Sequence, residues 1–353
     1  MKFTVNAKDF HAALKKADKV RLHKSALPSL EGVHISATGN ICTLLATNHE
    51  RWLSIPLKAE VKSPGSVTLD EIKALLKKIE LLREDTLTFE LPSEERSLTI
   101  TSKWQKFIQR TIRGPFAEMP KAEKGQTYSY TAEALKTRCN SVKYAMSSDL
   151  TRPVYTGIHF NGTDVVTMDM YRAALSTDNS LNITRPFTVP VDVLIAAKIM
   201  RGAIELKVDS KFLTISDGQD IFMCRLLCGD FMDYREVFKP KGNRVVINRK
   251  SFLESLEFLK AFAPVRKSAF SKMPVIAWEG NTLTLHETEN KCEVDFPHPM
   301  SGECAIGFQV QYMIEALKQF DTDEIMLAAK GSLEVMLLED GASQKALVLP
   351  HKV

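Results

Sequence analysis

The chain contains 353 residues, of which 44% are hydrophobic and 25% charged, and 47 basic against 43 acidic residues give it a net charge of +4. This composition is typical of a soluble protein large enough for about three domains, and it excludes a membrane-spanning class because no apolar run is long enough to cross a bilayer. Since the N-terminus shows no signal-like apolar stretch, we expect the protein to be cytoplasmic.

The same order of predicted elements recurs three times along the chain. A short strand of alternating apolar and polar residues runs directly into an amphipathic helix at residues 3–17, 128–139 and 245–259. Short alternating strands follow, and we expect a second helix of each repeat at residues 69–79, 191–200 and 310–320. Two helices among many antiparallel strands in each repeat predict an α+β fold, with the helices packed on the sheets.

Polar segments that contain proline and glycine interrupt the pattern at residues 120–125 and 239–243. They predict three domains, at residues 1–122, 123–242 and 243–353. Three alike domains in one chain indicate a quasi-symmetric assembly, which is either an open solenoid or a closed ring.

Sequence patterns of catalysis are missing from the chain. It has no glycine-rich phosphate loop, no Gly-x-Ser-x-Gly elbow and no His-Glu-x-x-His helix, so we expect no enzyme activity. The six cysteines are scattered, and only Cys224 and Cys228 are close enough in sequence to share one face of a strand. Because no His or Cys pair completes a zinc site with them, we expect reduced core thiols, no metal and no cofactor.

The first helix of each repeat is basic, whereas the rest of the chain is acidic overall. On the first of these helices, an apolar stripe that includes Phe10 and Leu14 leaves Lys15, Lys16 and Lys19 facing away from the core. A charged helix face is usually only a solvated face. Three equivalent helices of the same sign also fit a continuous positive lining for a polyanion.

Several short stretches, taken in order, resemble the bacterial DNA polymerase III beta subunit, the sliding clamp family. They are MKFTV at residues 1–5, ALP at 26–28, TRPVYTG at 151–157, Asp169 with Arg172, GDFMDYR at 229–235, IGF at 306–308 and LVLP at 347–350. The resemblance covers essentially the whole chain. It implies three DNA-clamp domains that form half of a ring, and a head-to-tail homodimer that closes around double-stranded DNA independently of its sequence and keeps the replicative polymerase processive.

The resemblance also implies partners and DNA-contacting residues. We expect the clamp loader complex, the DNA polymerase III alpha subunit and other proteins with a clamp-binding motif as partners, and no membrane. A ring holds DNA by topology, so weak and screened phosphate contacts suffice. The residues expected at the DNA are Lys15, Lys16, Lys19, Lys24, Arg138, Lys143, Ser148, Arg152 and Lys260. Lys24 matches a basic residue of a DNA-contacting loop of the family, whereas Asp149 is a poor phosphate partner.

In this family, partner peptides bind an apolar cleft between the second and third domains. The matching positions are Tyr155, Met168, Met170, Tyr171, Arg172, Ala173, Met232, Val237, Leu347, Val348, Leu349 and Pro350. Met170 stands where a glycine is common and Tyr155 where a leucine is usual, so we expect a reshaped cleft that methionine side chains make adaptable. The alternative is that these are simply core residues at a domain junction.

For the dimer interface, the resemblance points to Phe107, on a strand predicted at residues 104–108, and to Phe262 on the opposite side. Phe107 could equally pack against its own domain. An edge strand must be paired or protected, and head-to-tail closure would do so.

Two other functions stay open from the sequence. A paralogue with the clamp fold could serve as a protein-binding scaffold without encircling DNA, and it would lack salt-sensitive DNA retention. A nuclease or polymerase accessory domain with an unrecognised metal site would bind divalent metal or hydrolyse DNA.

Overall fold

The computed structural model describes residues 1–82, 86–92, 97–263, 274–280, 282–285, 290–293, 306–330 and 334–351. By its internal contacts the chain divides into two compact units, one formed by residues 1–136 and 192–226 and the other by residues 137–191 and 227–353. Both units combine helices with antiparallel sheets, which confirms the predicted α+β class.

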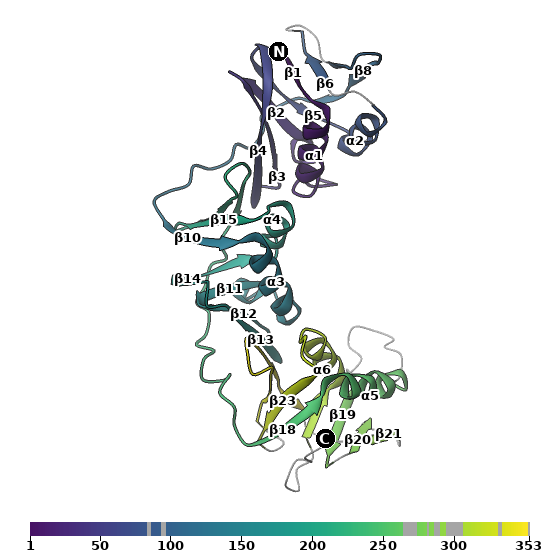
Figure 1. Ribbon diagram of the computed structural model, residues 1–353, viewed down its shortest axis with the longest axis vertical. Helices are drawn as coiled ribbons and strands as arrows, with labels where there is room; N and C mark the ends of the chain where they lie inside the picture. Colours follow the sequence, from purple (N-terminus) through teal and green to yellow (C-terminus); the bar gives the residue numbers. More distant parts are fainter. Residues whose placement is uncertain are drawn as a thin grey trace. The chain divides into compact units, whose positions relative to one another are not determined.

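The first unit is built on one sheet of 13 strands. Its helices are α1 (Ala7–Asp18), α2 (Ile72–Leu81) and α4 (Val193–Ile199). Its strands are β1 (Lys2–Asn6), β2 (Val33–Thr38), β3 (Ile41–Thr47), β4 (Arg51–Ser63), β5 (Gly65–Leu69), β6 (Thr86–Glu90), β7 (Leu98–Thr101), β8 (Lys106–Gln109), β9 (Thr111–Ile112), β10 (Gln126–Thr131), β15 (Ala203–Val208), β16 (Phe212–Ser216) and β17 (Ile221–Arg225). Helices α1 and α2 lie side by side next to strands of this sheet (Figure 1).

The second unit carries one sheet of eight strands and one of five. Its helices are α5 (Arg249–Ala261) and α6 (Val310–Leu317), and the boundary between the units falls within α3 (Ala132–Val142). The larger sheet contains β11 (Gly157–Gly162), β12 (Asp164–Met168), β13 (Arg172–Thr177), β14 (Ile183–Pro190), β18 (Asn243–Asn248), β23 (Glu324–Ala329), β24 (Met336–Glu339) and β25 (Gln344–Val348). The smaller sheet contains β19 (Val275–Glu279), β20 (Thr282–Leu285), β21 (Lys291–Glu293), β22 (Ile306–Gln309) and β26 (Pro350–His351).

The three repeated first helices share one way of beginning. Each follows a strand directly, and the residue at the junction caps the free amides of the first turn. The Asn6 side chain accepts hydrogen bonds from the amides of residues 8 and 9, at 2.9 and 3.1 Å. Thr131 Oγ1 accepts from residue 134 at 3.2 Å, and the Asn248 side chain accepts from residue 251 at 3.0 Å. The repeated helix start in the sequence is therefore a repeated cap.

A His–Thr contact marks the first two repeats in the same way. His34 Nδ1 lies 3.0 Å from Thr68 Oγ1, and His159 Nδ1 lies 2.9 Å from Thr188 Oγ1. Each imidazole also stacks on a phenylalanine of the Gly-x-Phe segment that closes its repeat, with ring centroids 4.9 Å apart in the first case and 4.2 Å in the second. Sequence similarity between these repeats thus reflects matched side-chain packing.

Sheets run across both predicted domain boundaries. Strand β17 pairs with β4, and β25 pairs with β13, so each junction is made of ordinary ladder hydrogen bonds. Because of these pairings, the predicted middle domain is divided between the two units: residues 192–226 group with the N-terminal part of the chain and residues 137–191 with the C-terminal part. The division into domains 1–122, 123–242 and 243–353 stays a prediction.

Candidate functional site

Several residues of the predicted cleft surround one cavity in the second unit. The cavity has a volume of about 190 Å³ and is lined by Ser147, Asp149, Arg152, Tyr155, Met168, Asp169, Met170 and Met232. Since three of these residues are methionines, we call it the methionine cavity. Tyr155, Met168, Met170 and Met232 were predicted for the cleft, and Arg152 was predicted for DNA.

A tight turn between β12 and β13 presents Met170 to solvent. Asp169 Oδ1 accepts hydrogen bonds from the amides of Tyr171 and Arg172, at 2.7 and 2.9 Å, and thereby closes the turn. Met170 stands at the tip of this turn and is 61% exposed.

Arg172 connects this turn to helix α6. Its guanidinium bonds Asp169 at 3.0 Å and also bonds Glu315 on α6. It lies over the ring of Tyr312, 4.4 Å from the centroid. Ion pairs and cation–π contacts of a largely buried guanidinium fix its position, so the rim of the methionine cavity is held by α6. Sequence analysis did not identify Glu315 or Tyr312, because they lie far from Arg172 in the chain and no local pattern links residues so far apart.

Another wall of the cavity comes from the segment after Gly229. The Phe231 ring packs between those of Tyr155 and His159, with centroids 5.2 and 4.2 Å away. Tyr234 donates a hydrogen bond from its hydroxyl to Asp164 at 2.9 Å. With its neighbours fixed in this way, Met232 is left 47% exposed over the cavity.

The other predicted cleft residues lie in several different environments. Ala173, Val237 and Leu347 join the apolar cluster that contains Met168, and Leu349 is 40% exposed, with its amide bonded to the carbonyl of Tyr171 at 2.8 Å. Val348, in contrast, is 1% exposed and belongs to the core around α5 and α6. The remaining two are Tyr171, which is 53% exposed, and Pro350, which begins β26 and is half-buried.

The predicted DNA residues differ in whether a carboxylate of the described residues pairs with them. Lys15, Lys19 and Lys24 are exposed, and no carboxylate of the described residues lies within ion-pair distance of them. Lys143 donates to the Asn140 side chain at 2.7 Å, and Lys260 donates to the Gln311 side chain at 2.6 Å, so both keep their full charge.

Two of the predicted DNA residues are already paired. Lys16 binds Asp220 at 2.5 Å, and the Asp220 side chain is 1% exposed. Arg138 bonds Asp178 at 3.4 Å and the Ser343 hydroxyl at 3.0 Å. Because carboxylates of the same chain largely neutralise these two charges, both residues would bind a phosphate less strongly than an unpaired lysine.

The loops that carry Lys24 and Asp149 are equivalent in the first two repeats. The amide of Leu22 bonds the carbonyl of Leu30, and the amide of Ser147 bonds the carbonyl of Tyr155, both at 2.9 Å. Lys24 and Asp149 each stand two residues after the loop begins. Hydrogen bonds from Thr151 hold the pKa of the Asp149 carboxyl below its usual range, so this loop is negative where the first is positive. Ser148 and Arg152 are exposed in the same loop.

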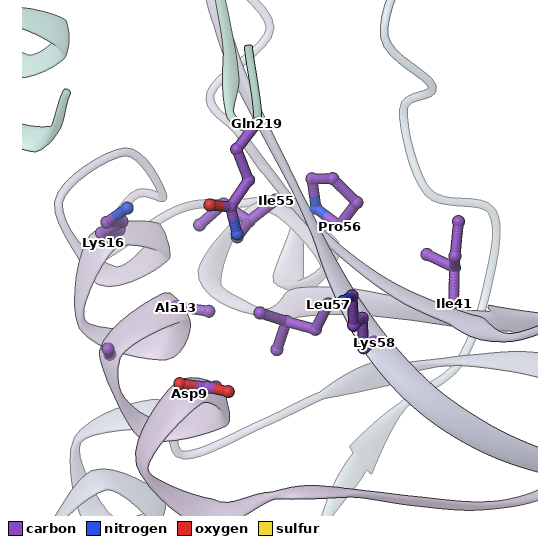
Figure 2. A pocket seen from close by; sticks show the side chains of 10 residues that line it. Asp9, Ala13, Lys16, Ile41, Ile55, Pro56, Leu57, Lys58 and Gln219 are labelled. Carbon is purple, nitrogen blue, oxygen red and sulfur yellow. The ribbon is translucent and has the colours of Figure 1, made fainter. Parts of the chain in front are cut away.

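A larger cavity, of about 520 Å³, lies in the first unit (Figure 2). Asp9, Ala13 and Lys16 on α1 form one side, and Ile55 and Leu57 on β4 form the other. The lining continues with Ala12, Ile41, Pro56, Lys58 and Gln219. Apart from Lys16, none of these residues was predicted for a site.

The candidate dimer surface is more apolar than the sequence suggested. Strand β8 is the last strand of its sheet, and next to the half-buried Phe107 the structure exposes Ile108 at 66% and Trp104 at 74%. Phe262 is 49% exposed, and its ring lies 5.0 Å from that of Phe258, which is 54% exposed. Strand alternation would have indicated Ile108 as the outward partner of Phe107.

Expectations about cysteines hold only in part. Cys42, Cys139 and Cys224 are buried free thiols, but Cys228 is exposed. The expected shared strand face of Cys224 and Cys228 is wrong, because β17 ends at Arg225. Cys304 lies outside the described residues. Within the described ranges no group of three His, Cys, Asp or Glu side chains is placed to hold a metal ion, and no helix is long and apolar enough to span a membrane.

Comparison with known proteins gives a consistent result. Residues 1–115 match the family model described as the DNA polymerase III beta subunit, N-terminal domain. The chain is 24% identical to the beta sliding clamp of Staphylococcus epidermidis, over 99% of both chains, and 18% identical to that of Bacillus subtilis, over 96% of this chain and 95% of the other.

Solved structures agree in fold. The DNA polymerase III beta subunit of Thermotoga maritima is similar with a TM-score of 0.85 at 21% identity, over 100% of this chain and 99% of the other. That of Pseudomonas aeruginosa reaches a TM-score of 0.87 at 20% identity, over 100% of both chains. The chain therefore has the fold of the DNA polymerase III beta subunits and is similar over its whole length to the beta sliding clamps, and its first 115 residues match their N-terminal domain.

Proposed function

We propose that the chain works as a DNA sliding clamp, a ring-shaped homodimer that encircles duplex DNA and tethers the replicative polymerase for processive synthesis. The similar proteins are named as beta sliding clamps and DNA polymerase III beta subunits, and the proposed role for this chain is likewise a non-catalytic one. The observation that carries the proposal is the set of exposed lysines without carboxylate partners among the described residues on and after the first helix, namely Lys15, Lys19 and Lys24. Exposed cations that are free of carboxylates bind phosphates weakly enough for the protein to slide along DNA.

The methionine cavity is proposed as the site for partner peptides, among them those of the polymerase III alpha subunit and the clamp loader complex. Its lining combines Tyr155 and three methionines with a few polar side chains, and such a site with an exposed rim suits a short linear peptide. The apolar surfaces around Ile108 and Phe262 are proposed as the two sides of the head-to-tail contact. Such a clamp would be a cytoplasmic protein.

Topological retention tests this function. The protein is loaded onto nicked circular DNA with the clamp loader, unbound protein is removed, and the circle is then cut once with a restriction enzyme. A sliding clamp stays on the circle at raised salt and leaves on cutting. A protein that is dimeric by light scattering but fails to load would instead support the scaffold paralogue, a reading that the pairing of Lys16 and Arg138 within the fold favours.

A further inference from the structure

The methionines of this chain are not equally exposed. The chain has 13, of which Met273 and Met300 lie outside the described residues. Among the rest, only Met170 and Met232 are exposed, at 61% and 47%, and both line the methionine cavity. Met1, Met119, Met146 and Met326 are half-buried, and the others are buried. The two most exposed methionines of the described chain thus lie at one site.

We propose that Met170 and Met232 form a reversible oxidation site that controls binding at the methionine cavity. The oxidant is a hydroperoxide, which transfers one oxygen atom to the thioether sulfur. The O–O bond breaks, an S–O bond forms, the sulfur loses two electrons, and the peroxide leaves as water or an alcohol. The product is methionine sulfoxide, which reductases return to methionine.

Arg152 gives the oxidised form of Met170 a partner. In the reduced protein its Nη1 lies 3.5 Å from the Met170 sulfur. A thioether is a weak acceptor, whereas a sulfoxide oxygen is strongly polar, so the guanidinium bonds the oxidised side chain better than the reduced one. Oxidation therefore favours a side chain held against Arg152 at the cavity mouth.

The consequence for binding follows from the chemistry of the lining. An apolar peptide side chain gains free energy by leaving water for an apolar wall, and two sulfoxides remove that gain and bring bound water. This control rests on the proposed function of the cavity. It predicts that peroxide lowers partner affinity without unfolding the protein, since the buried methionines stay protected.

The test uses the full chain in a Cys228→Ser background, because the exposed Cys228 thiol also reacts with peroxide. The protein is treated with graded hydrogen peroxide, desalted, mapped by peptide mass spectrometry and titrated with purified polymerase III alpha subunit. Each sample is compared with its own untreated control. Met170→Leu/Met232→Leu is the matched variant, and methionine sulfoxide reductases A and B are used for reversal.

We expect Met170 and Met232 to be oxidised before the buried Met168, with an affinity loss of about tenfold that the reductases reverse and that the double leucine variant does not show. Equal oxidation of Met168 would overturn the site. An affinity change below about twofold at full oxidation, or an equal loss in the leucine variant, would overturn the control. If untreated protein does not bind the alpha subunit, both the proposed function of the cavity and its regulation by oxidation are wrong. The order in which the methionines are oxidised then still tests whether Met170 and Met232 form the oxidation site.

Discussion

The ring of His159 stacks on the ring of Phe231, with centroids 4.2 Å apart and planes inclined by 7°. The imidazole is 7% exposed, and burial, helped by the nearby Arg235 cation, lowers its pKa to about 4. Tyr234, whose hydroxyl bonds Asp164, packs edge-on against it. A neutral histidine is therefore part of the wall that supports Met232.

This burial predicts a loss of stability in acid. The unfolded chain takes up a proton near the ordinary pKa of 6.5, whereas the folded chain resists until about 4, so stability is complete above 6.5 and falls between these values. The full effect is on the order of 3 kcal/mol. Urea unfolding from pH 7.5 to 4.5 should show this slope, a smaller slope in His159→Asn, and an unchanged one in His23→Asn, an exposed control. Identical slopes in all three would refute the assignment.

Lys16 should matter for stability more than its neighbour. Lys16→Ala leaves the buried Asp220 carboxylate without its cation, at a cost of roughly 2 kcal/mol, whereas the exposed Lys15→Ala should change stability by less than about 0.5 kcal/mol. Denaturant midpoints measure the difference. Equal midpoints for the two variants would show that the pair contributes nothing.

Charge reversal separates DNA contacts from a solvated face. Lys19→Glu/Lys24→Glu should reduce salt-resistant loading on circular DNA, because each lost phosphate contact weakens binding and adds repulsion. Lys121→Glu/Lys124→Glu carries the same change of charge in an exposed segment and serves as control. Loading that falls equally in both would indicate a general effect of net charge.

At the C-terminal end, two adjacent residues should act differently. Leu349→Ala removes an exposed side chain and should weaken alpha-subunit binding about tenfold with little loss of stability. Val348→Ala opens the core instead and should cost roughly 2 kcal/mol of unfolding free energy. Calorimetric titration and urea unfolding of both variants distinguish the effects. Full binding by Leu349→Ala would remove this residue from the cleft.

The dimer prediction can be tested with two exposed isoleucines of the first unit. Ile108→Lys, on the edge strand β8, should shift sedimentation from dimer to monomer, because a charge replaces buried apolar area at the proposed contact. Ile41→Lys, at 48% exposure on β3, should leave the dimer intact. A dimer that survives Ile108→Lys would move the interface away from β8.

Local elements were predicted well, and their ends less so. The six helices appear where periodicity placed them, since caps such as Asn6 and Asn248 are written in the sequence. The second helix of the first repeat begins at Ile72 rather than residue 69, because Leu69 ends β5 and Glu71 has a φ of 49°. Pairing with a distant strand, which no local pattern reports, decided that boundary.

The sequence by itself determined the repeated order of strands and helices, the α+β class and the excess of lysine on the first helix. These follow from periodicity, capping and composition, which act between residues close in the chain. Only the tertiary structure decided that Lys16 is bound to Asp220 and that Val348 lies in the core while Leu349 is exposed. Such outcomes depend on which distant segments pack together, and long-range packing sets burial and ion pairing residue by residue.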